Sequence, residues 1–387
     1  MPTTAAGQLA KEFESIAVMA CSAAKLQSIL HGIPLFPDEL LTKLLHLSLG
    51  VLVTPVNAVS NLRRSILRGC ERLSVPVISV GNLTYGGSGK SPFCRWLARR
   101  CIEMGFKVGI VLPSYSPVSA HHAASLTEDE LLEHSQYLPH VPVAMGRRRE
   151  VAARRLIERD GCDLVVLDDG FQYRLLHRDL DIVLVDGLHA PHIFCPMLRE
   201  PLKALRRANI VCLTKVNAAR AFMGDEHLGE FENTLRKASG ISELVKVDYI
   251  PIDLFQIITG ELLQQEQLAG VKAIGVVGTA EPYSFFYTAR RLGINLIKLF
   301  VFEDHHSYSS EEVSFFCEAM RRYGAEVLIT TLKDAMRLRS SILNLTECYK
   351  RFNSWYAVRI DVRIIDGVEV LEGALNRVMK IGMAKRC

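Results

Sequence analysis

The chain has 387 residues, of which 49% are hydrophobic and 23% are charged. This composition is typical of a folded globular protein, and at ~150 residues per domain the length predicts two or three domains. There are 46 Lys and Arg and 42 Asp and Glu. This small net positive charge does not indicate nucleic-acid binding. The ten cysteines form no CxxC pair, so neither a disulfide scaffold nor a zinc ribbon is expected. Nothing in the sequence indicates a protein partner.

The first 39 residues carry no clear secretory signal. Lys11, Glu12 and Glu14 interrupt any apolar run there, whereas a signal peptide needs an uninterrupted apolar stretch. We expect an amphipathic helix in this extension. Its acidic residues make it a poor organelle transit peptide.

An apolar segment follows. Leu44–Leu62 has no formally charged residue and is flanked by Lys43 and Arg63. Its length is just below the ~20 residues that span a bilayer, and Pro55 weakens a spanning interpretation. We therefore predict that residues 40–68 lie in a membrane surface as a basic-flanked apolar helix. A buried core helix is the alternative.

From Val75 onward, short apolar runs alternate with helical stretches, a pattern typical of a parallel sheet covered on both faces. Strands are predicted at 75–80, 107–112, 163–167, 181–185, 209–213, 273–277, 295–302 and 326–330, and helices at 92–104, 149–159, 282–292 and 310–322. The predicted fold class is α/β: a P-loop NTPase-like parallel-sheet domain, a second α/β domain and an N-terminal membrane-contacting helix. The predicted divisions are 1–72 for the extension and membrane helix, 73–217 for the first parallel-sheet domain, 218–270 for a junction and 271–387 for the second domain.

The strongest local signal is a phosphate-binding loop between a predicted strand and a predicted helix. Its nucleotide-binding residues are Thr84, Tyr85, Gly86, Gly87, Ser88, Gly89, Lys90 and Ser91. Glycines let backbone N–H groups turn toward phosphate oxygens, Lys90 supplies positive charge, and Ser91 offers a hydroxyl to Mg²⁺. A strict Walker A sequence would have glycine in place of Thr84. A glycine-rich turn that binds no nucleotide is the alternative.

Two carboxylates follow a buried strand, at the end of the run LVVLDDG. Asp168 and Asp169 would lie at the carboxyl edge of the sheet, where the phosphate loop also opens. Carboxylates there hold Mg²⁺ directly or through water. A turn capped by Asp-Gly is the alternative interpretation.

Two further clusters combine charge with possible site chemistry. Glu303-Asp304-His305-His306 follows a predicted strand, and an acid beside a histidine orients the imidazole. Arg199 and Glu200 precede a proline turn and are suited to phosphate or metal contact. A surface loop and a solvated charged turn are the respective alternatives.

In this order, the motifs resemble those of the tetraacyldisaccharide 4'-kinases, from about Leu40 to the C-terminus. The matching stretches are VPVISVGNLTYGGSGKSP, GRRREVAARRL, VVLDDGFQYRLLHRDLDIVLVDG, PMLREPLKALRRA, VVGTAEPYSFF, EDHHSYS and TTLKDAMRL. The resemblance implies ATP-dependent phosphorylation of the 4'-hydroxyl of an acylated glucosamine disaccharide, a lipid A precursor, with Mg²⁺. It also implies two α/β/α units with the active site between them. The lipid disaccharide and a membrane surface are the implied partners.

The resemblance also assigns residues. It implies catalytic roles for Lys90, Asp129, Asp304 and His305, and metal contact by Ser91, Asp168 and Asp169. Glu200 is a further candidate metal contact from the charged turn described above. Asp129 is aligned with the family's base, although the glycine of the family's Gly-Asp-Glu element is missing. Tyr173 replaces a family histidine. These departures fall on the acceptor side, and therefore leave open a degenerate nucleotide-binding membrane protein without kinase turnover.

A P-loop GTPase switch is a further alternative. It would need an Asn-Lys-x-Asp element, whereas the nearest string is Thr214-Lys215-Val216-Asn217. The expected location is membrane-associated: the cytoplasmic face of the inner membrane in a bacterium, or the mitochondrion in a eukaryote. The acyl pattern of the acceptor and the oligomeric state do not follow from the sequence.

Overall fold

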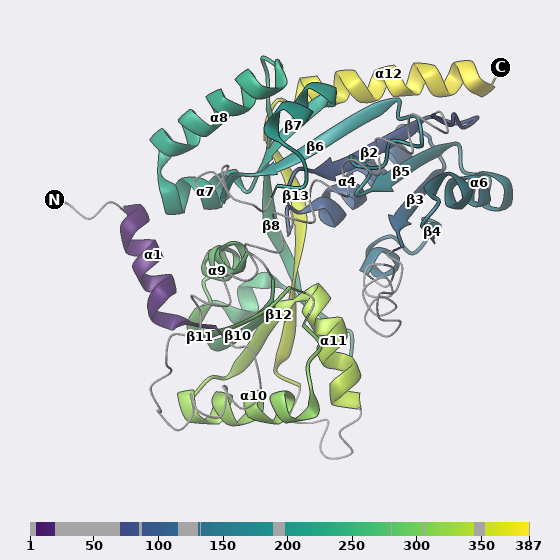
Figure 1. Cartoon of the computed structure of the whole chain (residues 1–387). Helices are drawn as coiled ribbons and strands as arrows, with labels where there is room; N and C mark the ends of the chain where they lie inside the picture. The colour runs from purple at the N-terminus through teal and green to yellow at the C-terminus, as the bar shows by residue number, and fades with distance from the viewer. Residues whose placement is uncertain are drawn as a thin grey trace. The chain divides into compact units, whose positions relative to one another are not determined.

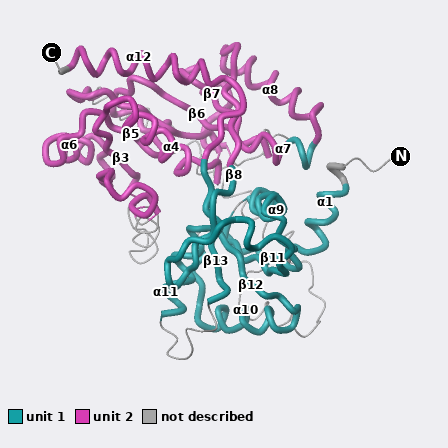
Figure 2. The backbone as a smooth tube through the Cα atoms, turned by 180° about the vertical axis from the view of Figure 1, so that it is seen from behind, with its two compact units in different colours: residues 1–39, 220–223, 250–361 teal, residues 40–219, 224–249, 362–387 magenta. Residues whose placement is uncertain are grey.

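The chain forms two compact units. The computed structural model describes residues 5–19, 70–84, 87–114, 131, 133–188, 198–279, 281–304, 306–343 and 353–386 (Figure 1). Unit 1 comprises Met1–Glu39, Arg220–Met223 and Ile250–Asp361, and unit 2 comprises Leu40–Ala219, Gly224–Tyr249 and Val362–Cys387 (Figure 2). The predicted α/β class is confirmed in both.

Unit 2 is built on a parallel sheet. Its strands lie in the order β8-β7-β6-β2-β5-β3-β4, and all the described pairings between these strands are parallel. The bounds are β2 (Val77–Asn82), β3 (Val108–Pro113), β4 (Val143–Gly146), β5 (Leu164–Asp168), β6 (Leu180–Asp186), β7 (Ile210–Thr214) and β8 (Val245–Gln256). Because β2, β3, β5, β6 and β7 are buried along their whole length, their near-continuous apolar runs agree with burial on both faces.

Helices pack on this sheet. They are α4 (Lys90–Glu103), α6 (Arg149–Asp160), α7 (Val216–Met223), α8 (Asp225–Ser239), the 3₁₀ helix η2 (Leu202–Arg207) and α12 (Val368–Arg386). α4 packs against β2, β3 and β5, and α6 against β3 and β4. The β2–α4 connection therefore stands beside the end of β5, which pairs with β2.

The strands of unit 1 lie in the order β1-β11-β10-β12-β13, and the pairings along this order are parallel. Its elements are α1 (Ala5–Ile16), β1 (Ala17–Met19), β9 (Leu262–Leu263), the 3₁₀ helix η3 (Gln265–Leu268), β10 (Lys272–Gly278), α9 (Pro282–Arg291), β11 (Asn295–Phe302), α10 (Ser310–Tyr323), β12 (Val327–Thr331), α11 (Leu332–Leu343) and β13 (Trp355–Asp366). β9 pairs antiparallel with the end of β8.

The N-terminal extension contributes to unit 1. α1 presents Phe13, which stacks on Tyr283 at 4.1 Å and meets Phe286 edge-on at 5.5 Å. β1 then adds a parallel edge strand, with Ala17 opposite Leu299. The predicted amphipathic helix is thus present, and its apolar face is buried in this unit.

The units cut across the expected divisions. The stretch predicted as a junction, 218–270, contains α8 and β8, and α12 belongs to unit 2 although it falls within 271–387. The reason is that β8 and β13 each carry the chain from one unit to the other. Within the described part of the chain, no helix is long and apolar enough to cross a membrane. The predicted membrane segment, 40–68, lies outside the described residues.

Candidate active site

The phosphate loop turns sharply from β2 into α4. Gly89, the residue before the helix, has a φ of 79°, a left-handed conformation that glycine adopts without strain. A Cβ there would lie 2.0 Å from the Tyr249 hydroxyl, which instead donates a hydrogen bond to the Gly89 carbonyl at 2.9 Å. Lys90 and Ser91 therefore occupy the first turn of α4, where backbone N–H groups and the helix dipole favour anions.

Neighbouring strands brace the loop. Asn82 Nδ2 donates to Ser88 Oγ at 2.9 Å, and Lys215 Nζ, at the end of β7, donates to the Gly87 carbonyl at 2.8 Å. Lys215 also pairs with Asp186 at 2.5 Å. These contacts hold Gly87 and Ser88 in place before any nucleotide binds, which lowers the entropy cost of binding.

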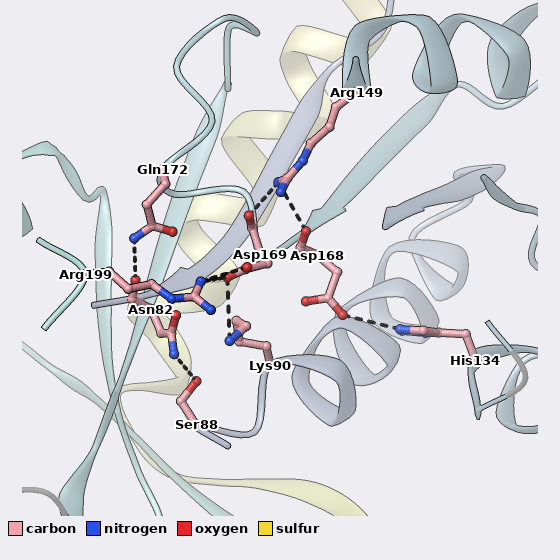
Figure 3. Close-up of polar contacts among 9 residues, drawn as sticks. All are labelled: Asn82, Ser88, Lys90, His134, Arg149, Asp168, Asp169, Gln172 and Arg199. Carbon is pink, nitrogen blue, oxygen red and sulfur yellow. Dashed lines mark hydrogen bonds and ion pairs between the residues drawn. The ribbon is translucent and has the colours of Figure 1, made fainter. Parts of the chain in front are cut away.

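Asp169 lies at the centre of a charged cluster (Figure 3). Lys90 Nζ lies 3.6 Å from Asp169 Oδ1, and Arg199 Nη1 donates to both carboxylate oxygens at 2.8 Å. Burial alone would raise the pKa of Asp169, but Lys90, Arg199 and Arg149 together hold that pKa well below its usual range. Asp169 is therefore a carboxylate that keeps two cations gathered beside the phosphate loop.

Arg149 clamps the turn that carries both carboxylates. Asp169 has a φ of 55°, which is unusual for a residue with a side chain. Arg149 Nη1 donates to the carbonyls of Asp168 and Asp169, at 3.3 and 2.5 Å. Its guanidinium lies 5.0 Å from the centre of the Tyr173 ring. Tyr173, where the family has histidine, in turn donates its hydroxyl proton to Glu150 and so supports the clamp.

Asp168 ends β5 and is buried. Its Oδ2 lies 3.4 Å from Nε2 of His134, which is also buried. Burial opposes ionisation of Asp168, but the His134 hydrogen bond and the nearby Lys90 charge lower its pKa. The carboxylate is thus ionised and available as an oxygen ligand.

Glu200 occupies a different environment. Arg174 Nη2 donates to its Oε2 at 2.9 Å and Arg207 Nη2 to its Oε1 at 3.0 Å. The Arg207 guanidinium also lies over the Phe171 ring at 4.3 Å. Both oxygens of this predicted metal ligand are therefore engaged by arginines.

The second histidine-containing cluster belongs to unit 1. His306 Nε2 lies 3.1 Å from both carboxylate oxygens of Glu312, and the Tyr308 hydroxyl donates to Asp334 at 3.1 Å. Thr331 and Arg337 also contact the Asp334 carboxylate, at 2.7 and 3.3 Å. The loop that begins with Glu303 and Asp304 is therefore anchored at its far end.

The predicted site residues fall into three groups: those in unit 2, one in unit 1, and those outside the described residues. The structure gathers Ser88, Gly89, Lys90, Ser91, Asp168 and Asp169 in unit 2, with Thr84, Gly87 and Glu200 in the same unit, whereas Asp304 belongs to unit 1. Tyr85, Gly86, Asp129 and His305 lie outside the described residues. No motif pointed to His134 or Tyr249, and Lys215 appeared only in the string compared with Asn-Lys-x-Asp. Arg149 was part of a matching motif, but its carbonyl contacts depend on the fold.

Comparisons with known proteins identify one family that matches this chain. The family model for tetraacyldisaccharide-1-P 4'-kinase matches residues 43–380. The chain belongs to this family. The tetraacyldisaccharide 4'-kinases of Geobacter sulfurreducens and Anaeromyxobacter sp. (strain K) are 31% and 32% identical to it. The alignments cover 80% and 83% of this chain, and 85% and 88% of those proteins.

A solved structure of the family is also similar. The crystal structure of LpxK from Aquifex aeolicus in complex with ATP superimposes with a TM-score of 0.59 and 25% sequence identity. The match covers 86% of this chain and 98% of that one. The chain is therefore a kinase of the lipid A 4'-kinase family, and nucleotide binding at the phosphate loop is consistent with this relative.

Proposed function

We propose that this protein transfers the γ-phosphoryl group of ATP to the 4'-hydroxyl of a tetraacylated glucosamine disaccharide, a step of lipid A biosynthesis. The observation that carries the proposal is the cluster of Lys90, Asp169 and Arg199 beside the phosphate loop, in a chain of this family. Phosphoryl transfer depends mainly on positioning and on neutralising charge. A preformed cationic cluster beside a braced loop supplies both.

Each described residue has a role in this reaction. Backbone N–H groups at the start of α4 bind phosphate oxygens, and Lys90 neutralises charge on the transferred group. Arg199 donates to the same carboxylate and keeps it in place (Figure 3). Asp169 in turn holds Lys90 near the position where the γ-phosphate arrives.

The residues present fit a magnesium ion. The Ser91 hydroxyl and the ionised Asp168 carboxylate are the hard oxygen donors that Mg²⁺ prefers. Mg²⁺ in phosphate-transfer sites is held largely by phosphates and water, so a few oxygen donors from the protein suffice. Bound Mg²⁺ supplies charge neutralisation on the β- and γ-phosphates. Asp169 and Glu200 are further candidate ligands, and their arginine partners would compete with the metal.

On the acceptor side, we assign the general base to Asp129, oriented by His305 with Asp304 beside it. This assignment rests on the motif resemblance. A carboxylate is suited to accept the hydroxyl proton as the oxygen attacks phosphorus. The acyl chains of the acceptor would remain in a bilayer that residues 40–68 contact, at the cytoplasmic face of a bacterial inner membrane or in the mitochondrion of a eukaryote.

A transfer assay tests the proposal. The purified chain is incubated with γ-labelled ATP, Mg²⁺ and tetraacyldisaccharide 1-phosphate in mixed micelles, and lipid-bound label is measured. We expect label in the lipid that depends on both ATP and protein. The alternative, a nucleotide-binding protein without turnover, predicts ATP binding with no labelled lipid.

A further inference from the structure

A buried histidine contacts the carboxylate that ends β5. His134 is fully buried, and its Nε2 faces Asp168 Oδ2 at 3.4 Å. Because an ionised carboxylate only accepts hydrogen bonds, the facing nitrogen must be the donor. Its Nδ1 has no hydrogen-bond partner within the described part of the chain. Nε2 therefore serves as a hydrogen-bond donor aimed at Asp168.

The helical turn that carries His134, residues 133–137, is fixed to α4. Arg95 of α4 forms an ion pair with Glu133 at 3.0 Å, and both side chains are almost completely buried. The same guanidinium lies 4.1 Å from the centre of the Tyr137 ring. These contacts flank His134 along the turn, so the imidazole is held by the same helix that begins with Lys90 and Ser91.

This arrangement distinguishes the two oxygens of Asp168. Oδ2 is turned toward His134, whereas the other oxygen points to the side where Lys90 and Asp169 lie (Figure 3). The His134 donor restricts rotation of the carboxylate, which also has a hydrogen bond with the Cys94 side chain. With the donor, one oxygen is consistently presented to the phosphate-loop side. Partners of this kind behind a ligating carboxylate or imidazole typically affect metal affinity or activity by ~10–100-fold.

We propose that His134 is a positioning residue that fixes the orientation of Asp168, so that one carboxylate oxygen is presented to the metal of the Mg·ATP complex. This inference rests on the proposed function, in which Asp168 is a metal ligand. It adds a role for His134, a residue of the helical turn that docks on α4.

Two substitutions of similar volume separate hydrogen bonding from packing. His134→Leu removes the donor and keeps most of the bulk, whereas in His134→Gln the side-chain amide nitrogen can occupy the position of Nε2. The measurement is Mn²⁺ affinity in the presence of a non-hydrolysable ATP analogue, followed by electron paramagnetic resonance, so it does not depend on turnover. We expect His134→Leu to weaken Mn²⁺ binding about 10-fold or more and His134→Gln to stay near wild type.

Controls make the result specific. Ser135→Ala changes an exposed hydroxyl in the same turn and should leave Mn²⁺ affinity unchanged. If His134→Leu does not fold, His134→Asn replaces it, because its shorter side chain places the amide near the Nδ1 position and out of reach of Asp168. Equal weakening in the donor-lacking variant and His134→Gln would indicate a packing role and overturn the inference.

Asp168→Asn distinguishes failure of the inference from failure of the proposed function. If Asp168→Asn weakens Mn²⁺ binding but His134→Leu does not, only the role of His134 is wrong. If Asp168→Asn has no effect on Mn²⁺ affinity, the metal role of Asp168 is wrong and the inference falls with it. Weakening in Asp168→Asn and His134→Leu, with recovery in His134→Gln, supports both.

Discussion

At the scale of single residues, Asp169 is a fixed negative charge within the cationic cluster of unit 2. Asp169 adopts a left-handed backbone conformation and is surrounded by Lys90, Arg199 and Arg149. Strained conformations of this kind persist only where the surroundings determine them. Here Arg149 holds the backbone carbonyl and Arg199 holds the side chain. The cost of the conformation is thus offset by charge-assisted hydrogen bonds, and the result is a fixed anion beside Lys90.

Lys90→Ala should abolish transfer and leave the fold intact. The Lys90 ammonium acts on the transferred phosphoryl group, and loss of one preorganised electrostatic contact typically lowers kcat by about 10²–10³-fold. The measurement is kcat with saturating ATP and lipid, together with thermal unfolding. Lys237→Ala, at an exposed position of α8, is the matched control. Turnover above a tenth of wild type would show that Lys90 has another role.

Glu200→Gln tests the second candidate metal ligand. Because both carboxylate oxygens accept from Arg174 and Arg207, we expect the substitution to lower the free energy of unfolding by about 1–3 kcal/mol. The Mg²⁺ concentration for half-maximal activity should change less than in Asp168→Asn. A large rise in that concentration at unchanged stability would instead identify Glu200 as a ligand.

Among the elements, the loop after β11 is held by two buried carboxylates. Glu312 caps α10 by accepting from the Ser309 N–H at 2.8 Å and also contacts His306. Asp334 gathers Tyr308 and Thr331, and burial raises its pKa in spite of the nearby Arg337 charge. His306 and Tyr308, which make these contacts, follow Asp304 closely in the sequence. They restrict the loop that carries the predicted catalytic residues of unit 1.

Tyr308→Phe should therefore lower kcat several-fold with little change in the KM for ATP. The variant removes one hydrogen bond from Asp334 but keeps the aromatic packing against Phe302, and the described phosphate-loop contacts all belong to unit 2. Tyr323→Phe, on α10, is the control. Steady-state kinetics with varied ATP provide the test; an increased KM for ATP at constant kcat would contradict this role for the loop.

Some of these elements could be predicted from the sequence, and others could not. The predicted strand 295–302 coincides with β11, and the helix predicted at 310–322 is one residue shorter than α10, because continuous apolar runs and a capping serine are local signals. β8 and β13 were not predicted, because charged residues such as Asp248 and Asp253 interrupt their apolar pattern. The phosphate loop is likewise local. Contacts such as Lys215 with Gly87, 128 residues apart, arise only when β7 lies beside β6 in the folded sheet.

At the scale of the whole molecule, both ends of the chain are incorporated into the folded units. α1 and β1 complete unit 1, and α12 belongs to unit 2. Truncation of the N-terminus would remove the edge strand β1 together with the apolar segment 44–62. Membrane contact is therefore better tested by substitution than by deletion.

Three aspartates placed along the apolar segment should release the protein from vesicles. The substitutions are Leu45→Asp, Leu49→Asp and Val53→Asp, spaced by four so that they share one face of a helix. We expect at least a 10-fold loss of binding to vesicles that contain anionic lipid, because charge on the apolar face opposes insertion. Sedimentation with vesicles measures binding, and affinity for an ATP analogue should not change.

The control adds the same charge at polar positions of that segment: Ser48→Asp, Asn57→Asp and Asn61→Asp. We expect this protein to retain more vesicle binding than the first variant. Equal binding by both variants and the wild type would rule out contact through this segment. Aggregation of the first variant alone would favour a buried helix instead.

The position of the transferred phosphate tests the central claim most directly. The product formed from tetraacyldisaccharide 1-phosphate, ATP and Mg²⁺ is isolated, and its phosphates are located by ³¹P NMR and fragmentation mass spectrometry. We predict one new phosphate monoester at the 4'-oxygen, and no product from an acceptor that lacks the 4'-hydroxyl or from Lys90→Ala. ATP binding without any phosphorylated lipid, or a phosphate on another hydroxyl, would contradict the account.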